Sequence, residues 1–316
     1  MKRIKVGVIG VGYLGQFHAE KYAKLANVEL VGVVDPDRSR GTYIAQKLNT
    51  RAFPDASGLL GLVDAVSIVV PTVLHHATAK QFLEHGVHIL IEKPITVTLE
   101  QADELINLAS TKGLALQVGH IERFNPAVTS IRSLLKSPRY LQAERSAPFT
   151  PRCTDVNVVL DLMIHDLDIA ADLAGSRPIE VSAAGVSIIT KEIDSVIARI
   201  VFENGCVADL AASRVSEEKK RLLKVFDGDT LYTSDYQAQK AFSSRRGIGA
   251  MPEFITTEIP TERRDTLFDE VNAFIRCIEQ QSRPVVSGVE GKNALALARL
   301  ISQSIEQGIT GFVPVP

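Results

Sequence analysis

The sequence predicts two domains: an α/β Rossmann-type doubly wound parallel sheet, then an α+β domain with a largely antiparallel open sheet. Three observations lead to this prediction. The run VGVIGVGYLG at residues 6–15 passes from strand-like residues into a glycine-rich turn. Apolar strand-like runs then alternate with helical patterns as far as residue 120. Beyond residue 121, successive strand-like runs are joined by short turns, which is typical of an antiparallel sheet.

The glycines of the first run have the spacing of a dinucleotide-binding turn. Gly10 permits the turn, Gly12 lets the backbone approach a pyrophosphate, and Gly15 allows close packing of helix on strand. Tyr13 and Leu14 lie just before the helix start, whose N–H groups would face the phosphates. The motif alone is weak evidence, because small loops also collect glycines, so the residues that follow decide.

Asp35 ends the second predicted strand, residues 28–34, and lies 20 residues beyond Gly15. A carboxylate at this offset can accept hydrogen bonds from the adenosine ribose and would repel a 2′-phosphate, which favours NAD over NADP. Arg38, a candidate cofactor contact, and Arg40 keep that choice open. The alternative is that Asp35 only shapes the turn of Asp-Pro-Asp.

Strands and helices continue to alternate through the first domain. The predicted helices are 16–25, 42–48, 57–62, 77–85 and 99–111, and the further strands are 65–70, 88–91 and 115–119. The run at 65–70 is too apolar to alternate, so we expect it to be covered on both faces. Strand ends of such sheets form the ligand crevice, and the residues expected there are Pro71, Thr72, Glu92, Lys93 and His120.

The second domain is expected to be a sheet with a few helices. The predicted helices are 128–135, 161–173, 266–280 and 289–307, and the strands are 139–146, 180–189, 196–203, 207–215, 222–227 and 230–236. Residues 237–253 are the candidate for a mobile or substrate-covering loop. We place the domains at 1–120 and 121–316, with the C-terminal helix packing back on the first.

Composition excludes several classes of protein. The chain has 316 residues, 45% hydrophobic and 23% charged, with a net charge of −2, so nothing suggests nucleic acid binding. It opens with Met-Lys-Arg and a core strand, so no signal peptide or membrane span is expected and the predicted location is cytoplasmic. Cys153, Cys206 and Cys277 are expected to be free thiols. No metal is expected, because the histidines at 75, 76, 85 and 88 have no accompanying ligand set.

Four segments together resemble the Gfo/Idh/MocA oxidoreductase family. They are GVGYLG at 10–15, DAVSIVVPTVLH at 64–75, EKP at 92–94, and DLMIHDLD at 161–168, which is similar to the family segment D-x-x-x-H-x-x-D. Thr72 departs from the Asn of many members, and Met163 departs from a Gly. The resemblance implies NAD as cofactor, a cofactor contact by His75, and a homo-oligomer (dimer or tetramer) formed through the second-domain sheet.

Within that family, the run GHIERFNPAV at 119–128 is most similar to bacterial nucleotide-sugar dehydrogenases. This resemblance implies a small-molecule sugar or nucleotide-sugar substrate, oxidised at C3 of UDP-N-acetylglucosamine for lipid A biosynthesis. The alternatives are another sugar, inositol or a UDP-sugar uronate. A further alternative is a non-catalytic NAD-responsive binding protein, against which the intact Lys93, Asp161 and His165 argue.

The residue types suit oxidation of a secondary alcohol, which requires removal of the hydroxyl proton. A histidine titrates near neutral pH, so His165 is the natural base. Asp161, four residues earlier on the predicted helix, can orient that ring or bind a sugar hydroxyl. Lys93 can hydrogen-bond the reacting oxygen. In the family both Lys and His contact that hydroxyl, and which of them takes the proton is left open.

A nucleotide diphosphate needs cations and its base needs amide partners. Arg123 and Asn125 begin the second domain and are the first candidates. Arg152 and Asn157, just before Asp161, and Arg245 are further candidates. Surface arginines are common, so Arg152 and Arg245 are the weaker of these.

Overall fold

The computed structural model describes residues 3–151, 156–248, 253–308 and 313–315. It divides into two compact units, residues 1–121 with 265–292 and residues 122–264 with 293–316. The predicted boundary at residue 120 places residues 265–292 in the second domain. The structure places them in the first, because the apolar face of a helix there joins the first core: Val271, Phe274 and Ile275 are fully buried in it.

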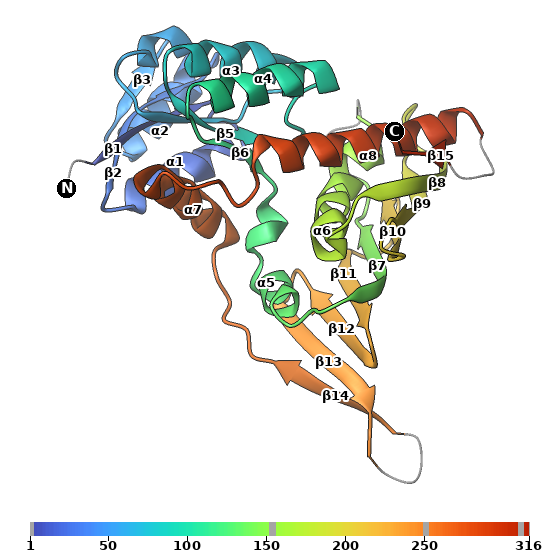
Figure 1. Ribbon diagram of the computed structural model, residues 1–316. Helices are drawn as coiled ribbons and strands as arrows, with labels where there is room; N and C mark the ends of the chain where they lie inside the picture. Colours follow the sequence, from blue (N-terminus) through green and yellow to red (C-terminus); the bar gives the residue numbers. More distant parts are fainter. Residues whose placement is uncertain (1–2, 152–155, 249–252, 309–312, 316) are drawn as a thin grey trace. The chain divides into compact units, whose positions relative to one another are not determined.

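The first unit is built on a six-stranded parallel sheet of order β3-β2-β1-β4-β5-β6, the strand order of a dinucleotide-binding sheet. The strands are β1 (Ile4–Ile9), β2 (Val28–Val34), β3 (Arg51–Phe53), β4 (Ala65–Ile68), β5 (His88–Glu92) and β6 (Leu116–Gly119). The helices are α1 (Gly15–Lys24), α2 (Arg38–Lys47), α3 (His75–Glu84), α4 (Leu99–Thr111), α7 (Thr266–Gln280) and the start of α8 (Gly288–Glu306). Figure 1 shows α3 and α4 on one face of this sheet and α1 and α7 on the other.

Local sequence explains where several of these elements begin. Asp37 caps α2 by accepting hydrogen bonds from the Ser39 and Arg40 N–H groups. Thr98 and Gln101 form a reciprocal capping box at the start of α4. The helix predicted at 57–62 is instead a short 3₁₀ turn, η1 (Ala56–Leu59), and a second one, η2 (Thr72–Leu74), precedes α3.

The second unit is built on a nine-stranded sheet of order β14-β13-β12-β11-β7-β10-β9-β8-β15. Its strands are β7 (Pro138–Ser146), β8 (Pro178–Val186), β9 (Ser195–Phe202), β10 (Val207–Ser213), β11 (Lys220–Asp227), β12 (Thr230–Asp235), β13 (Lys240–Arg246), β14 (Phe254–Ile259) and β15 (Val313–Pro314). Its helices are α5 (Pro126–Arg132), the π-helical turn η4 (Val159–Met163), α6 (Ile164–Ala174) and the rest of α8; the 3₁₀ turn η3 (Ile121–Phe124) leads into it. All its strand pairs are antiparallel except β7 with β10, which confirms a largely antiparallel sheet.

One face of this sheet packs on helices and carries the second core. Along β9, buried Val196, Ala198 and Ile200 alternate with exposed residues, the expected pattern for a sheet covered on one side. The buried set packs with α5, α6 and the later part of α8.

The prediction of a loop at residues 237–253 is wrong over much of this range. Residues 240–246 form β13, which pairs with β12 on one side and β14 on the other. The sequence KAFSSRR lacks the apolar alternation of a strand, so only backbone pairing with two neighbours makes it one. Residues 249–252, within the predicted loop, lie outside the described residues.

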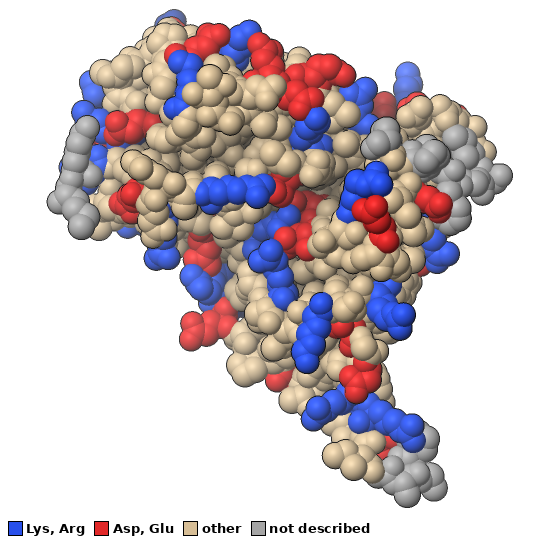
Figure 2. Space-filling model, in the orientation of Figure 1, with Lys and Arg blue, Asp and Glu red and all other residues tan. Residues whose placement is uncertain are grey.

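Within the described ranges, no helix combines the length and apolar character needed to span a membrane. Figure 2 shows acidic and basic side chains interspersed over the face in view.

Candidate active site

The glycine-rich turn after β1 has the geometry that its sequence predicts. Gly10 has a φ of +84°, and a Cβ there would lie 2.3 Å from the Val69 carbonyl oxygen. A Cβ on Gly15 would lie 1.8 Å from the Gly10 carbonyl oxygen, so helix and turn could not pack this closely with any other residue. These two glycines are required by the protein's own backbone.

Gly12 differs, because a Cβ there would meet no atom of the described residues within 4 Å, its chain neighbours aside. The protein itself gives no reason for a glycine at this position, whereas a bound pyrophosphate does. Leu14, at the N-cap of α1, makes no side-chain cap, and the first turn of that helix holds no acidic residue. An uncapped helix start beside an open turn suits an anion, so this cradle fits the phosphates of NAD.

Asp35 holds the turn together from the end of β2. Its buried carboxylate accepts hydrogen bonds from the N–H groups of Val11 (2.9 Å) and Asp37 (2.9 Å). Arg40 donates to the same carboxylate at 3.1 Å, and this bond raises the pKa of the Arg40 guanidinium. The arginine beside Asp35 is therefore Arg40, whereas Arg38 is exposed at the start of α2. A carboxylate oxygen has room for further donors, so these bonds leave the predicted ribose contact feasible.

Beyond the end of β4, Pro71 occupies the N-cap position of η2 without making a side-chain cap, and Thr72 is half-buried within that turn. His75, at the start of α3, is buried, and its ring nitrogens lie 2.9 Å from the carbonyl oxygens of Val70 and Pro94. Burial lowers the pKa of this imidazole. Its ring links two loops of the first unit, so these contacts do not support the predicted contact with a cofactor.

Lys93 follows β5 directly and is half-buried, with a cis peptide bond to Pro94. The neighbouring Glu92 carboxylate is turned inward, where His18 contacts it at 3.1 Å. Burial opposes the charge of Glu92, but the hydrogen bond from His18 and the charge of Lys93 hold its pKa below its usual range. The contacts that the structure gives the Glu92 carboxylate are internal, and its contact with the cofactor stays a prediction. His120 is buried immediately after β6.

In the second unit, Asp161 and His165 lie on either side of a change in helix type. Asp161 is in the π-helical turn η4, and His165 is the second residue of α6. Both side chains are half-buried. Single π-helical turns are rare and occur often at functional sites. The predicted segment is therefore helical, but Asp161 does not have the ordinary α-helical relation to His165.

Two arginines fix α6 around His165. Arg145 on β7 binds the carboxylate of Asp166, the next residue, with bonds of 2.7 and 3.0 Å. Burial opposes the charge of Arg145, but Asp166 outweighs it and raises the arginine's pKa. Arg123 binds Asp168 with bonds of 2.6 and 3.0 Å and also pairs with Asp172 at 2.6 Å. Such forked pairs set orientation as well as charge.

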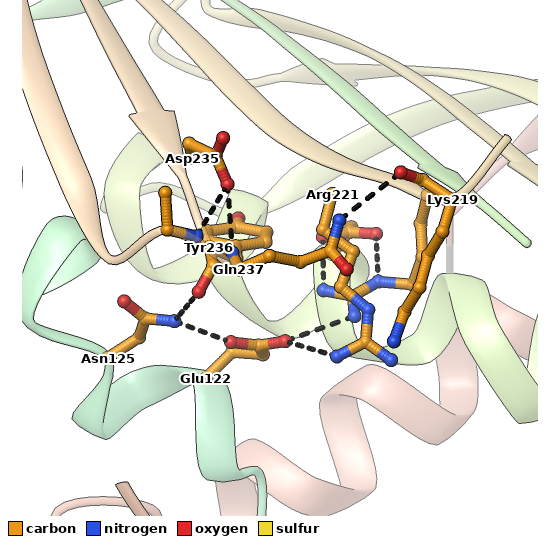
Figure 3. Close-up of polar contacts among 10 residues, drawn as sticks. Glu122, Asn125, Lys219, Arg221, Asp235, Tyr236 and Gln237 are labelled. Atoms are coloured by element: carbon orange, nitrogen blue, oxygen red, sulfur yellow. Dashed lines mark hydrogen bonds and ion pairs between the residues drawn. The ribbon is translucent and has the colours of Figure 1, made fainter. Parts of the chain in front are cut away.

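Figure 3 shows how Asn125 and Glu122 join this network. The Asn125 amide donates to the Glu122 carboxylate and to the Tyr236 carbonyl oxygen, each at 3.0 Å, and its own oxygen caps α5. Glu122 also pairs with Arg145 at 3.1 Å and with Arg221 at 3.6 Å. The polar groups of Asn125 are used internally.

The residues predicted to bind substrate therefore differ in whether their side chains already have partners within the protein. Arg123 and Asn125 both have internal partners, so the structure does not support their contact with substrate. Asn157 has its side chain bonded to Leu160 N–H (3.0 Å) and Ser302 (3.2 Å), where it shapes the start of η4. Arg245 is exposed on β13, and Arg152 and Cys153 lie outside the described residues.

Sequence reasoning missed His18, Glu270 and Arg145. His18 lies three residues after Gly15 on the face of α1 that meets the sheet, so its helical spacing was the available signal. Glu270 and Arg145 carry no comparable signal, because their partners lie far away in the sequence.

Comparison with known proteins extends this description. Residues 4–120 match the family described as "Oxidoreductase family, NAD-binding Rossmann fold", and residues 127–230 match the GFO/IDH/MocA C-terminal domain. The chain is 42% identical to UDP-N-acetylglucosamine 3-dehydrogenase of Acidithiobacillus ferrooxidans, over 97% of this chain and 98% of that protein. It is 26% identical to an inositol 2-dehydrogenase of Rhizobium meliloti over 96% of this chain and 97% of that one.

Solved structures agree with these sequence relatives. The structure of the Acidithiobacillus ferrooxidans enzyme superposes with a TM-score of 0.91 at 40% identity, covering 97% of this chain and 99% of that one. A levoglucosan dehydrogenase in complex with NADH and levoglucosan gives a TM-score of 0.89 at 19% identity, covering all of both chains, and shares the fold.

Proposed function

Because the chain belongs to the Gfo/Idh/MocA oxidoreductase family, an NAD-binding dehydrogenase family, we propose that it oxidises C3 of UDP-N-acetylglucosamine to the 3-keto sugar. The observation that carries the proposal is the extent of the match to the Acidithiobacillus enzyme, which covers nearly the whole of both chains. The substrate-contacting half of the sequence is therefore included in the similarity, as well as the cofactor half.

The roles of three side chains follow from their chemistry. His165 takes the proton of the reacting hydroxyl, since a neutral imidazole is a base near neutral pH. Lys93 donates a hydrogen bond to the same oxygen and stabilises the negative charge that develops there. Asp161 orients the imidazole or binds a neighbouring hydroxyl. NAD, when bound, accepts the hydride from the substrate carbon.

The test is a substrate panel monitored by NADH absorbance. UDP-N-acetylglucosamine should give the highest kcat/KM, above N-acetylglucosamine, myo-inositol and UDP-glucuronate. Lys93→Ala and His165→Ala should each lower kcat by about a hundredfold or more while NAD still binds. Higher turnover of inositol would overturn the substrate, and near-normal turnover of both variants would overturn the assigned residues.

We also propose that two copies associate through the face of the second-unit sheet turned away from α5 and α6. That face exposes Ile197 (63%) and carries a hollow of about 930 Å³ lined by residues of β7–β11 and by Ile305 and Gly308. Apolar side chains in such a position mark an interaction surface. A second copy is the occupant that the predicted homo-oligomer requires.

We also propose that the protein is located in the cytoplasm, as its sequence predicts. Cys206 and Cys277 are buried free thiols, which supports a reducing compartment. Detection of the protein in the soluble fraction of spheroplasts, and not in the periplasmic extract, is the expected result.

A further inference from the structure

A cluster of polar side chains is buried within the first unit between α1, β5 and α7. His18, Glu92 and Glu270 place a ring nitrogen and two carboxylate oxygens within 4.8 Å of one another. Glu270 is completely buried, and neither of its carboxylate oxygens has a hydrogen-bond partner among the described residues. Buried polar atoms of this kind require an explanation.

The groups around the two carboxylates form a chain of hydrogen bonds. The His18 ring contacts the Ser67 hydroxyl at 3.2 Å through Nδ1 and Glu92 at 3.1 Å through Nε2. The Tyr22 hydroxyl lies 2.8 Å from the same serine oxygen. From β6, the Gln117 amide donates to the Glu270 backbone carbonyl at 3.2 Å, and not to its carboxylate.

The two carboxylates are not equivalent. Glu92 has the His18 ring and the Lys93 backbone N–H (3.3 Å) as donors, whereas Glu270 has none among the described residues. Burial and then the charge of Glu92 raise the pKa of Glu270 well above its usual value, while Glu92 titrates below its own. Two adjacent buried carboxylates cannot both ionise cheaply, so the proton belongs on Glu270.

Glu92 connects this cluster to Lys93. The two residues are adjacent in sequence, and the Glu92 carboxylate accepts the Lys93 backbone N–H. It also lies over Gly119, where an added Cβ would come within 2.8 Å of Oε1. Movement of this carboxylate would therefore disturb the backbone that carries Lys93.

We propose that His18, Glu92 and Glu270 form a positioning site for Lys93, in which the two carboxylates share one proton, held on Glu270, and Glu92 keeps the negative charge. The site rests on the proposed role of Lys93 in sugar oxidation. The negative charge of the site lies on Glu92, the residue next to the lysine in the sequence.

Infrared spectroscopy of the full-length protein tests the shared proton without any turnover. The wild type should show the carbonyl stretch of a buried carboxylic acid at neutral pH, and Glu270→Gln should remove it. The matched control is Glu104→Gln, on the surface of α4, which should leave the band in place. Absence of the band from the wild type, or its loss in Glu92→Gln but not in Glu270→Gln, would overturn the assignment.

Kinetics test the link to Lys93. Glu92→Gln should lower kcat by about tenfold or more with the KM for NAD within about twofold, because it displaces the lysine and leaves the cradle intact. Glu270→Gln reproduces the neutral acid, so it should retain more of the wild-type kcat than Glu270→Ala. Equal kcat in wild type and Glu92→Gln would overturn the positioning role even where the infrared band is present.

A divalent cation is the competing occupant of the same three side chains. Metal analysis of the purified protein should find no metal in stoichiometric amount. Added Zn²⁺ or Mn²⁺ should raise the melting temperature of wild type by no more than it raises that of Glu270→Gln. A stoichiometric metal lost in Glu270→Gln would overturn the proposal. If the band behaves as expected but no sugar is oxidised, the proton site stands and the proposed function fails.

Discussion

Arg145 donates two hydrogen bonds, of 2.7 and 3.0 Å, to the carboxylate of Asp166, and Asp166 is the residue that follows His165. Both side chains are 2% exposed. Arg145→Met would leave Asp166 and Glu122 buried beside each other without this cation. Removal of one partner of a buried pair typically costs about 3–5 kcal/mol, so we expect that loss in the free energy of unfolding by urea. We also expect a lower kcat, since α6 carries His165.

The exposed pair of Arg177 and Glu203 provides the control. Its side chains are 56% and 63% exposed, so Arg177→Met should cost about 0–1 kcal/mol and leave kcat close to wild type. Similar losses in the two variants would show that the Arg145 pair has no special role.

Gly12→Ala and Gly15→Ala should separate cofactor binding from folding. A Cβ at Gly12 meets no atom of the described part of the chain within 4 Å, its chain neighbours aside, so this variant should fold normally. It should bind NAD about tenfold or more weakly, because the methyl group occupies the space of the pyrophosphate. A Cβ at Gly15 would lie 1.8 Å from a backbone oxygen, so that variant should lose stability. Calorimetric titration with NAD and thermal melts measure the two effects; unchanged NAD affinity in Gly12→Ala would contradict the cradle.

Substitution of Asp35 and Arg40 should change the preference of the protein for NAD over NADP. Wild type should prefer NAD, because the Asp35 carboxylate would repel a 2′-phosphate. Asp35→Ser should lower the NAD/NADP ratio of kcat/KM by about tenfold or more, since Arg40, 45% exposed at its side chain, is then released to bind that phosphate. The double variant Asp35→Ser, Arg40→Ala should lose this gain in NADP use. If it keeps the gain, Arg40 is not the phosphate ligand.

Stability should depend on pH through Glu270. Its pKa is raised in the folded protein, so its contribution is complete below the unfolded value near 4.5 and is lost as the pH rises through the folded value. Glu270→Gln does not titrate and escapes this loss. The melting temperature of the variant should therefore gain on that of wild type as the pH increases from 5 to about 8. A constant difference across this range would count against a protonated Glu270.

Ile197→Asp tests the sheet face. Ile197 is 63% exposed, so the change should leave the fold intact and convert the oligomer to monomer by placing a charge within a buried contact. Light scattering coupled to size exclusion measures the mass. Lys240→Asp, exposed on β13, is the matched control and should leave the mass unchanged; a monomeric wild type would refute the proposed interface.

Much of the first unit could be predicted, because parallel strands buried on both faces produce continuous apolar runs. The glycines from Gly10 to Gly15 could be predicted from their spacing along the chain, although the carbonyl oxygen that excludes a Cβ at Gly10 belongs to the distant Val69. β13 could not be predicted, because its residues lack the apolar alternation of a strand. Its backbone pairing with β12 and β14 is what makes it one. Arg123 and Asn125 were expected to be ligands because the sequence gives the charge of a guanidinium or the polar groups of an amide, but not their partners.

By itself, the sequence determined the dinucleotide-binding turn, the acid at the end of β2, and the residue types at 93, 161 and 165. These depend on spacing along the chain. Only the tertiary structure decided that α7 completes the first core, that Glu92 faces inward to His18 and Glu270, and that Arg145 grips Asp166. Those relationships join residues distant in sequence, and their energies arise from burial, which removes water and makes the nearest partner decisive.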